Sequence, residues 1–332
     1  MTILDAIILG IVEGITEYLP VSSTGHLIIT SWLLGLDESS EQAEAVNAFN
    51  IIIQGGAILA VLGLYRKRVL QMIRGLAGRD VAGRKLFTNL VIAFIPAAIL
   101  GVLLDDIIER HLFTPIPVIA ALFLGGILLL GMRRWQDRIY AAQNAGPGSG
   151  SSGDHEEREA DRFVDIEALS WKSALIIGFL QCVAMWPGTS RSMMTIVGGM
   201  FMGLRPRQAA EFSFLLGLPT LGGACVYKLG KALLRDGDGF ITTLGGWVPV
   251  AVGIAVATLA AAVAIKWLVE WLASHGLALF GWWRIALSMF LGGAIYMGWF
   301  TITPPADAEM TGNGSTTATL ATAGQVDVTP EG

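Results

Sequence analysis

The chain of 332 residues has little charge, since only 15% of it is Asp, Glu, Lys or Arg while 53% is hydrophobic. Soluble domains carry roughly a quarter charged residues, so this composition excludes that class. Two cysteines, Cys182 and Cys225, both lie in apolar runs. They do not form zinc, haem or iron–sulfur ligand patterns, and we expect them to be packing residues. No cleavable signal peptide is expected, because the first apolar run has no basic segment before it and no small-residue cleavage site after it.

What the chain has instead is long apolar segments. Several approach the roughly 20 residues that an α-helix needs to cross a bilayer. We therefore predict an all-α, polytopic integral membrane protein with full transmembrane spans at 45–65, 86–104, 115–132, 207–227, 246–268 and 282–301.

Two further pairs of apolar segments are too short to cross. Segments 3–19 and 21–36 are divided by Pro20, and segments 171–186 and 190–203 by Pro187 and Gly188. Half-length helices joined by a polar turn predict a re-entrant hairpin, here at 3–36 and at 171–203. Such irregular backbone is tolerated at membrane depth only where protein buries it or where it lines a cavity.

The two halves of the chain repeat. Residues 8–13 (ILGIVE) align with 176–181 (IIGFLQ), and after a one-residue gap 19–23 (LPVSS) align with 186–190 (WPGTS). A hairpin followed by three spans reverses the orientation of the next copy, which predicts two inverted-topology repeats. We expect the first repeat at 1–135, a cytoplasmic linker at 136–169, the second repeat at 170–302 and a disordered tail at 303–332.

The distribution of basic residues predicts the orientation. Loops 66–85 and 133–172 hold most of the lysines and arginines, and under the positive-inside rule both are cytoplasmic. The first hairpin then enters from the outer face, the second from the inner face, and their tips meet near the midplane. The basic residues expected at the inner face besides these loops are Arg205, Arg207, Lys266 and Arg284. The tryptophans expected to anchor the membrane interface are Trp282, Trp283 and Trp299.

The first hairpin tip places polar chemistry inside an apolar run, in the stretch from Glu13 to His26 (EGITEYLPVSSTGH). Ionisable groups at membrane depth are expensive and mark functional sites. Glu13 and Glu17 share a helix face, and Ser23 and His26 share another one. Polar residues of this region that we expect to contact substrate are Ser22 and Thr24, with Gln54 from the following span facing either the site or a neighbouring helix.

The second tip has the composition of an anion site. Arg191 carries a planar fork suited to phosphate, and a helix begins beside it with free N–H groups. Residues of this tip expected to bind the anion are Gly188, Thr189, Ser190, Ser192 and Thr195. Because two helix starts, an arginine and several hydroxyls converge, we predict a phosphate site within the membrane.

Two glutamates beside a phosphate would repel it, so a divalent cation, Mg²⁺ or Ca²⁺, is expected between Glu13, Glu17 and the phosphate oxygens. Such a metal would stabilise charge on a transferring phosphoryl group. Ser23 is a candidate nucleophile, activated by Glu17 or His26. His26 is the other candidate, either as nucleophile or as general acid or base, and activated water is the third possibility.

Both tip motifs closely resemble the two signature motifs of the undecaprenyl-diphosphate phosphatase family of bacitracin-resistance proteins. The stretch EFSFLLGLP from Glu211 is similar to that family as well, and the resemblance covers roughly residues 3–302. It implies hydrolysis of a C55 polyprenyl diphosphate to the monophosphate, which recycles the lipid carrier of cell-wall polymer synthesis. It also implies divalent-metal dependence and a site open to the outer face of the bacterial inner membrane. The residues that match its essential set are Glu13, Glu17, His26 and Arg191, with Ser23 matching a proposed nucleophile.

The expected partners are the polyprenyl diphosphate, membrane lipids and bacitracin, which competes for the substrate; no nucleic acid is expected, and homodimer formation is left open. A lipid flippase is the main alternative, because inverted repeats with broken helices are a transporter architecture. A phosphatase that uses two histidines is disfavoured, since His26 alone lies in the apolar core. A role limited to binding bacitracin is a further alternative.

Overall fold

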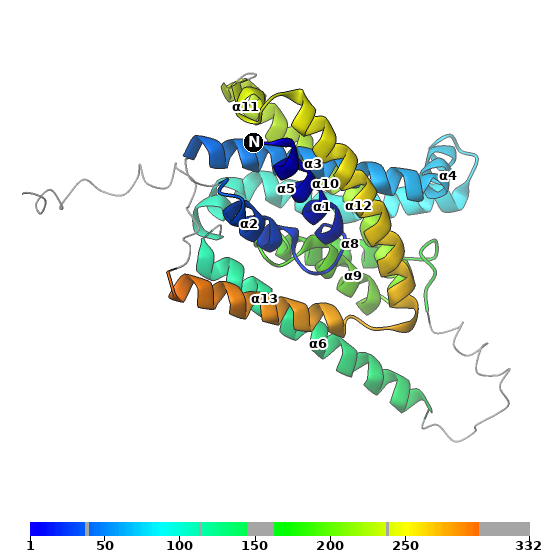
Figure 1. Ribbon diagram of the computed structural model, residues 1–332. Helices are drawn as coiled ribbons and strands as arrows, with labels where there is room; N and C mark the ends of the chain where they lie inside the picture. Colours follow the sequence, from blue (N-terminus) through cyan, green and yellow to red (C-terminus); the bar gives the residue numbers. More distant parts are fainter. Residues whose placement is uncertain (37–39, 113, 145–162, 237–238, 299–332) are drawn as a thin grey trace, which may run out of the picture.

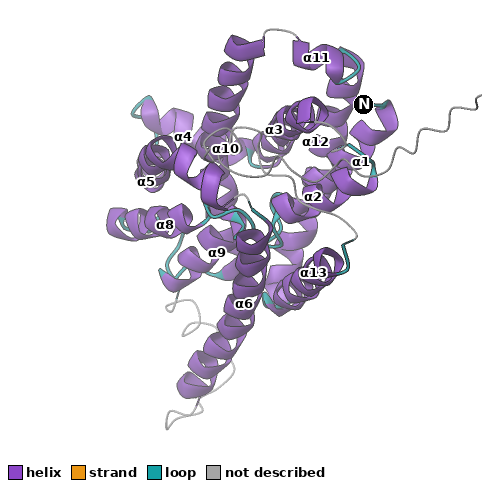
Figure 2. Cartoon of the chain, turned by 90° about the vertical axis from the view of Figure 1, so that its left-hand side faces the viewer, coloured by secondary structure: helices purple, strands orange, loops and turns teal. Residues whose placement is uncertain are grey.

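The structure is a computed structural model that describes residues 1–36, 40–112, 114–144, 163–236 and 239–298. Within these ranges the regular elements are α-helices, apart from an isolated bridge between Val164 and Leu204 (Figure 2). Most of the expected linker, the tail from 303 and Trp299 lie outside the described residues.

Six of the described helices are long and apolar enough to cross a membrane, as the sequence predicts. The protein is therefore a polytopic membrane protein of the all-α class. These six helices are α3 (Ser40–Leu64), α5 (Val81–Leu112), α6 (Pro115–Asn144), α10 (Pro206–Asp236), α12 (Trp247–Ser274) and α13 (Ala278–Tyr296).

A pair of short helices precedes the spanning helices of each half: α1 (Ile3–Thr16) and α2 (Ser23–Leu33) come before α3, and α8 (Trp171–Val183) and α9 (Arg191–Phe201) come before α10. The 14 residues of α1 span only about 21 Å, too little to cross. Thr2 and Asp5 form a capping box that fixes the start of α1. The break after α8 includes Gly188 at φ +93°, where an added Cβ would lie 2.6 Å from the Val118 carbonyl oxygen. Glycine is the residue that fits this turn.

The residue before each second short helix has the same unusual backbone. Ser22 precedes α2 with φ 75° and ψ 102°, and Ser190 precedes α9 with φ 74° and ψ 116°. They are the non-glycine residues with positive φ in the described chain. Such a conformation costs about 1–3 kcal/mol for a residue with a side chain, so the packing around both turns must hold them there.

Each first short helix packs on a spanning helix of the other half of the chain, α1 on α12 and α8 on α5 (Figure 1). Glycines allow the close approach. A Cβ on Gly10 would lie 2.8 Å from the Gly253 carbonyl oxygen, and one on Gly178 would lie 2.5 Å from that of Ala93. Gly10 and Gly178 are aligned in the sequence repeat, so the same contact occurs twice.

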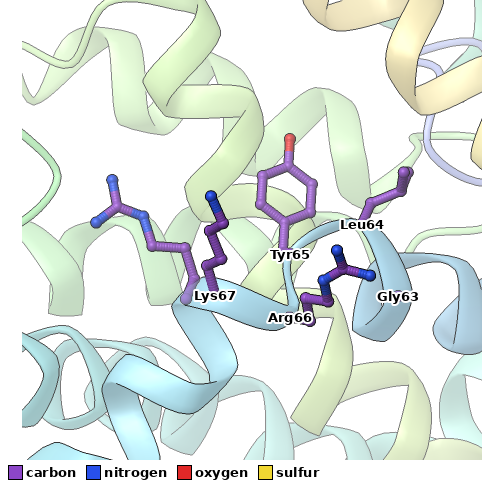
Figure 3. A pocket seen from close by; sticks show the side chains of 6 residues that line it. Gly63, Leu64, Tyr65, Arg66 and Lys67 are labelled. Atoms are coloured by element: carbon purple, nitrogen blue, oxygen red, sulfur yellow. The ribbon is translucent and has the colours of Figure 1, made fainter.

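Some segments expected to be loops are helical. Loop 66–85 contains α4 (Arg66–Leu76) and the start of α5. The loop expected after residue 104 is also helical, since α5 continues to Leu112 and no Gly or Pro interrupts it between Val102 and Leu112. Where α3 meets α4, a cavity of about 290 Å³ is lined by basic residues and Tyr65 (Figure 3). Arg68 in this lining pairs with Glu211 on α10 and with Glu167.

Candidate active site

Glu17 is the centre of the site. It caps the C-terminus of α1 and is 7% exposed. Its Oε2 accepts hydrogen bonds from Ser23 Oγ at 2.9 Å and from Gln54 Nε2 at 3.4 Å. Its Oε1 accepts one from Arg191 Nη2 at 3.2 Å. Three side chains, from α2, α3 and α9, therefore meet at the Glu17 carboxylate.

Arg191, the first residue of α9, is held on three sides. Besides Glu17, it donates from Nη1 to the Ser213 carbonyl oxygen at 3.0 Å, and its Cζ lies 5.6 Å from the centre of the Tyr18 ring. Tyr18 is itself fixed by a bond from its hydroxyl to the Ala57 carbonyl oxygen at 3.1 Å. The buried Nε of Arg191 has no hydrogen-bond partner among the described residues. The guanidinium is therefore oriented, and its Nε–H group remains available to another acceptor.

Glu13 lies one turn before Glu17 and is 1% exposed. Neither of its carboxylate oxygens has a hydrogen-bond partner within the described chain. An isolated buried carboxylate is costly, so these oxygens suit a cation. No group of three potential His, Cys, Asp or Glu ligands gathers among the described residues. Two carboxylates completed by phosphate oxygens and water would fit Mg²⁺, which favours such partial protein ligation.

His26 does not bond to Ser23 or Glu17 among the described contacts. Its Nδ1 donates to the Ser22 carbonyl oxygen at 2.8 Å, and its Nε2 accepts from Trp283 Nε1 at 2.8 Å. Both nitrogens are occupied, which defines a neutral ring with its proton on Nδ1. His26 thus lies beside the Glu17 cluster, on the same helix as Ser23, but is turned toward α13.

The hydroxyl residues of the second tip mainly join the tips to each other and to α10. Ser192 Oγ donates to the Leu19 carbonyl oxygen at 2.9 Å, and Thr195 Oγ lies 2.6 Å from Ser213 Oγ. Ser190 Oγ accepts from the Met193 amide and lies 3.0 Å from Ser192 Oγ. Besides Glu13, the predicted site residues whose side chains make no hydrogen bond within the described chain are Ser22 and Thr189, which are buried, and Thr24, which is half-buried.

Sequence reasoning missed the roles of Trp283 and Arg284. Trp283 is 52% exposed, as an interfacial anchor would be, yet it donates to His26. Arg284, expected as a basic residue at the inner face, is fully buried within α13. Its Nη2 donates to the carbonyl oxygens of Gly188 at 2.7 Å and Ala121 at 3.1 Å. The sequence contains one signal for this role, since Arg284 is a basic residue inside an apolar span. A charged residue buried at that depth needs a specific partner.

The fold and the site define a polytopic membrane protein with a carboxylate–arginine site between two pairs of half-length helices. Residues 6–290 match the model of the family described as "Bacitracin resistance protein BacA". The chain is 43% identical over 283 residues to an undecaprenyl-diphosphatase of Sorangium cellulosum, covering 85% of this chain and 83% of that one. An undecaprenyl-diphosphatase of Pseudomonas putida is 40% identical over 301 residues, 90% of this chain and 95% of the relative. The protein "Undecaprenyl-diphosphatase 2" of Rhodospirillum rubrum is 41% identical over 298 residues, 89% of this chain and 96% of the relative. This chain belongs to the BacA family.

Proposed function

We propose that this protein hydrolyses undecaprenyl diphosphate to undecaprenyl phosphate and inorganic phosphate. The names of its relatives support this reaction, and they do not favour the flippase alternative. The observation that carries the proposal is the cluster at Glu17, where a hydroxyl from one hairpin and a guanidinium from the other meet at a buried carboxylate. The reaction recycles the lipid carrier of cell-wall synthesis and opposes bacitracin, which binds the diphosphate.

Ser23 is the proposed nucleophile. Its hydroxyl already donates to Glu17 at 2.9 Å, so the carboxylate is placed to take the proton as Oγ attacks the terminal phosphorus. The anhydride P–O bond then breaks and undecaprenyl phosphate leaves. Water next attacks the phosphoserine, releasing inorganic phosphate and restoring the hydroxyl. Ser23 also begins α2, where the positive end of the helix dipole favours the anionic phosphoryl group.

Arg191 is the proposed phosphate-binding cation. Its bonds to Glu17 and the Ser213 carbonyl fix the plane of the guanidinium, and Nε remains to donate to a phosphate oxygen. The start of α9 adds the remaining free backbone N–H groups of its first turn, which would donate to the same anion. Lysine cannot reproduce this arrangement, since it lacks the planar fork.

Glu13 and Glu17 are the residues that would hold a divalent cation together with the substrate. A bound Mg²⁺ or Ca²⁺ would supply charge stabilisation on the phosphoryl oxygens. Glu13 supports this assignment because its buried oxygens have no hydrogen-bond partner in the described part of the protein. We assign His26 a role in proton transfer to the leaving group, with its ring oriented by Ser22 and Trp283.

The repeats are proposed to be inverted, with the site open to the outer face of the bacterial inner membrane. The paired contacts of Gly10 and Gly178 and the matching backbones of Ser22 and Ser190 support the repeat. A Ser151→Cys variant, with Cys182 and Cys225 changed to Ala, tests the orientation. An impermeant thiol reagent should label it only after the membrane is opened, and labelling of intact cells would overturn the orientation.

The decisive experiment measures phosphate release from undecaprenyl diphosphate by the purified protein and traps the phosphoenzyme. Ser23→Ala should abolish both the burst of phosphate capture and turnover. The matched control is Ser31→Ala on the same helix, which should keep both. If Ser23→Ala retains substantial turnover while His26→Ala loses all of it, the nucleophile is His26 or activated water. Absence of any phosphate release by the parent protein would refute the function.

A further inference from the structure

A second, larger cavity lies where the end of α12 meets the starts of α10 and α13. Its volume is about 810 Å³, and its lining comes from α6, α10, α12 and α13 together with Phe163. None of the residues of the Glu17 cluster is part of this lining. The cavity is therefore a feature that the proposed reaction does not use.

The charge of this lining is positive. Arg133, Arg205 and Arg207 all contribute, and the lining contains no Asp or Glu. Arg205 and Arg207 are exposed, and none of the ion pairs found in the described chain includes either of them. The Arg205 guanidinium lies 5.3 Å from the centre of the Phe163 ring. An aromatic ring covers one face of such a group and leaves its N–H edge for an oxygen anion.

The cavity is located at the boundary of the membrane. Arg133 is next to the last residue of the candidate span Pro115–Arg134, and Pro206 is the first residue of another. The lining residues Ser274 and Ala278 end one span and begin the next. Arginines at the ends of spans lie at the depth of lipid phosphates, where each is worth about 1 kcal/mol of attraction to an anionic leaflet.

An apolar flank continues from the arginines. Leu279 is 47% exposed and Trp282 is 63% exposed, both on the first turns of α13 and both in the lining. Trp271, also in the lining, stacks on His275 with their ring centroids 4.1 Å apart. Tryptophan at this depth favours the headgroup region of lipids. A soluble anion requires no such flank, whereas a lipid presents a phosphate and an acyl chain together.

We propose that this cavity binds the headgroup phosphate of an anionic phospholipid, with Arg205 and Arg207 holding the phosphate and Trp282 and Leu279 contacting the chains. This site is independent of the proposed hydrolysis, and its test does not depend on activity. Loss of each arginine should weaken the binding about 5-fold, the equivalent of one basic residue at a lipid surface.

The test is a titration of the purified full-length protein, followed by native mass spectrometry, with phosphatidylglycerol and with phosphatidylcholine. The parent should prefer phosphatidylglycerol, and Arg205→Gln/Arg207→Gln should bind it about 25-fold more weakly. The matched control, Arg79→Gln/Arg84→Gln, removes two exposed arginines elsewhere and should bind like the parent. If the double variant does not fold, Arg205→Lys/Arg207→Lys keeps the charges and should retain most of the preference.

Several outcomes would overturn the proposal. Equal binding of the two lipids, or equal binding by parent and double variant, would exclude a phosphate site at these arginines. Displacement of phosphatidylglycerol by millimolar inorganic phosphate would assign the cavity to a soluble anion. Binding of undecaprenyl phosphate alone would make it a product site. If the preference occurs only after Glu156, Glu157 and Glu159 are changed to Gln, the acidic segment of this chain is the occupant.

Discussion

The two hairpins share a backbone but divide the chemistry between them. Both second helices begin after a serine with φ near 75°, and both first helices pack through an aligned glycine. Their side chains differ in charge. The first hairpin carries Glu13 and Glu17, whereas the second carries Gln181 at the position aligned with Glu13, and Arg191. A repeated scaffold has thus been specialised into an anionic half and a cationic half.

The halves meet at a buried ion pair, Arg191–Glu17, in which the side chains are 10% and 6% exposed. Removing one partner of a buried pair leaves the other charge uncompensated, which is strongly destabilising. Gln181, the residue of the second hairpin that aligns with Glu13, differs from Glu13 in its hydrogen bonds. Gln181 Oε1 accepts a bond from Thr220 at 3.3 Å, while the Glu13 oxygens have no partner in the described structure. The comparison suggests that the first hairpin holds the cation and the second holds the phosphate.

The largest effect should come from removing the charge of the first hairpin at Glu17. Glu17→Gln keeps an oxygen that can accept a bond but cannot take the proton of Ser23, so kcat should fall about 10²–10⁴-fold. Inhibition by chelators should be lost along with it, because an amide is a weak ligand for a hard cation. Phosphate release with and without EDTA measures both. Glu167→Gln, which removes a carboxylate paired with Arg68, is the control and should stay near the parent.

The next effect should come from the second hairpin. Arg191→Lys preserves the charge but cannot bond to Glu17, the Ser213 carbonyl and a phosphate in one plane, so kcat/KM should fall about 100-fold. The melting temperature should change little. Near-normal kcat/KM in this variant would mean that Arg191 only joins the hairpins. Arg68→Lys is the matched control, since Arg68 also pairs with carboxylates but lies outside the tips.

A smaller effect should follow from releasing His26. Trp283→Phe removes one of the two bonds that orient the ring, and a neutral hydrogen bond of about 1 kcal/mol corresponds to about a 5-fold loss of kcat. Trp282→Phe is the matched control, because it makes the same substitution at the adjacent position and Trp282 does not bond to His26. A change in the pH profile of kcat in the first variant but not the second would separate a positioning role from a structural one. A rise in kcat would show instead that Trp283 restrains His26 away from the reaction.

The smallest effect tests the shared backbone. Ser22→Gly and Ser190→Gly both relieve a positive φ, which should raise stability by about 1 kcal/mol. Ser190 also caps α9 through the Met193 amide, whereas the Ser22 side chain makes no cap bond. Ser22→Gly should therefore raise the melting temperature in detergent more than Ser190→Gly. The reverse order would mean that the two turns are not equivalent.

Much of the candidate site could be predicted from the sequence, because its residues are polar types in apolar surroundings. Glu17, Ser23 and Arg191 belong to this group. The sequence allows Gln54 to face either the site or a neighbouring helix, and in the structure it faces the site. The contributions of Tyr18 and Ser213 could not be predicted, since one uses a ring face and the other a backbone carbonyl. The residue type alone does not indicate that a ring face or a backbone carbonyl oxygen will contact the arginine. The spans predicted at 86–104 and 207–227 end close to the ends of the apolar spans at Asp105 and Tyr227, but the helices α5 and α10 continue to Leu112 and Asp236, because hydropathy marks where a membrane ends and not where a helix does.

The sequence by itself determined the spanning helices, the paired half-length helices and the polar residues of the tips. Hydropathy and helix breaking are local properties, so they can be read along the chain. Tertiary structure alone decided which of those polar groups touch. Arg191 and Glu17 are 174 positions apart, and their bond depends on how α9 sits against the end of α1. The same packing turned His26 toward Trp283, 257 positions away, because a side chain bonds to whichever neighbour the fold brings within about 3 Å.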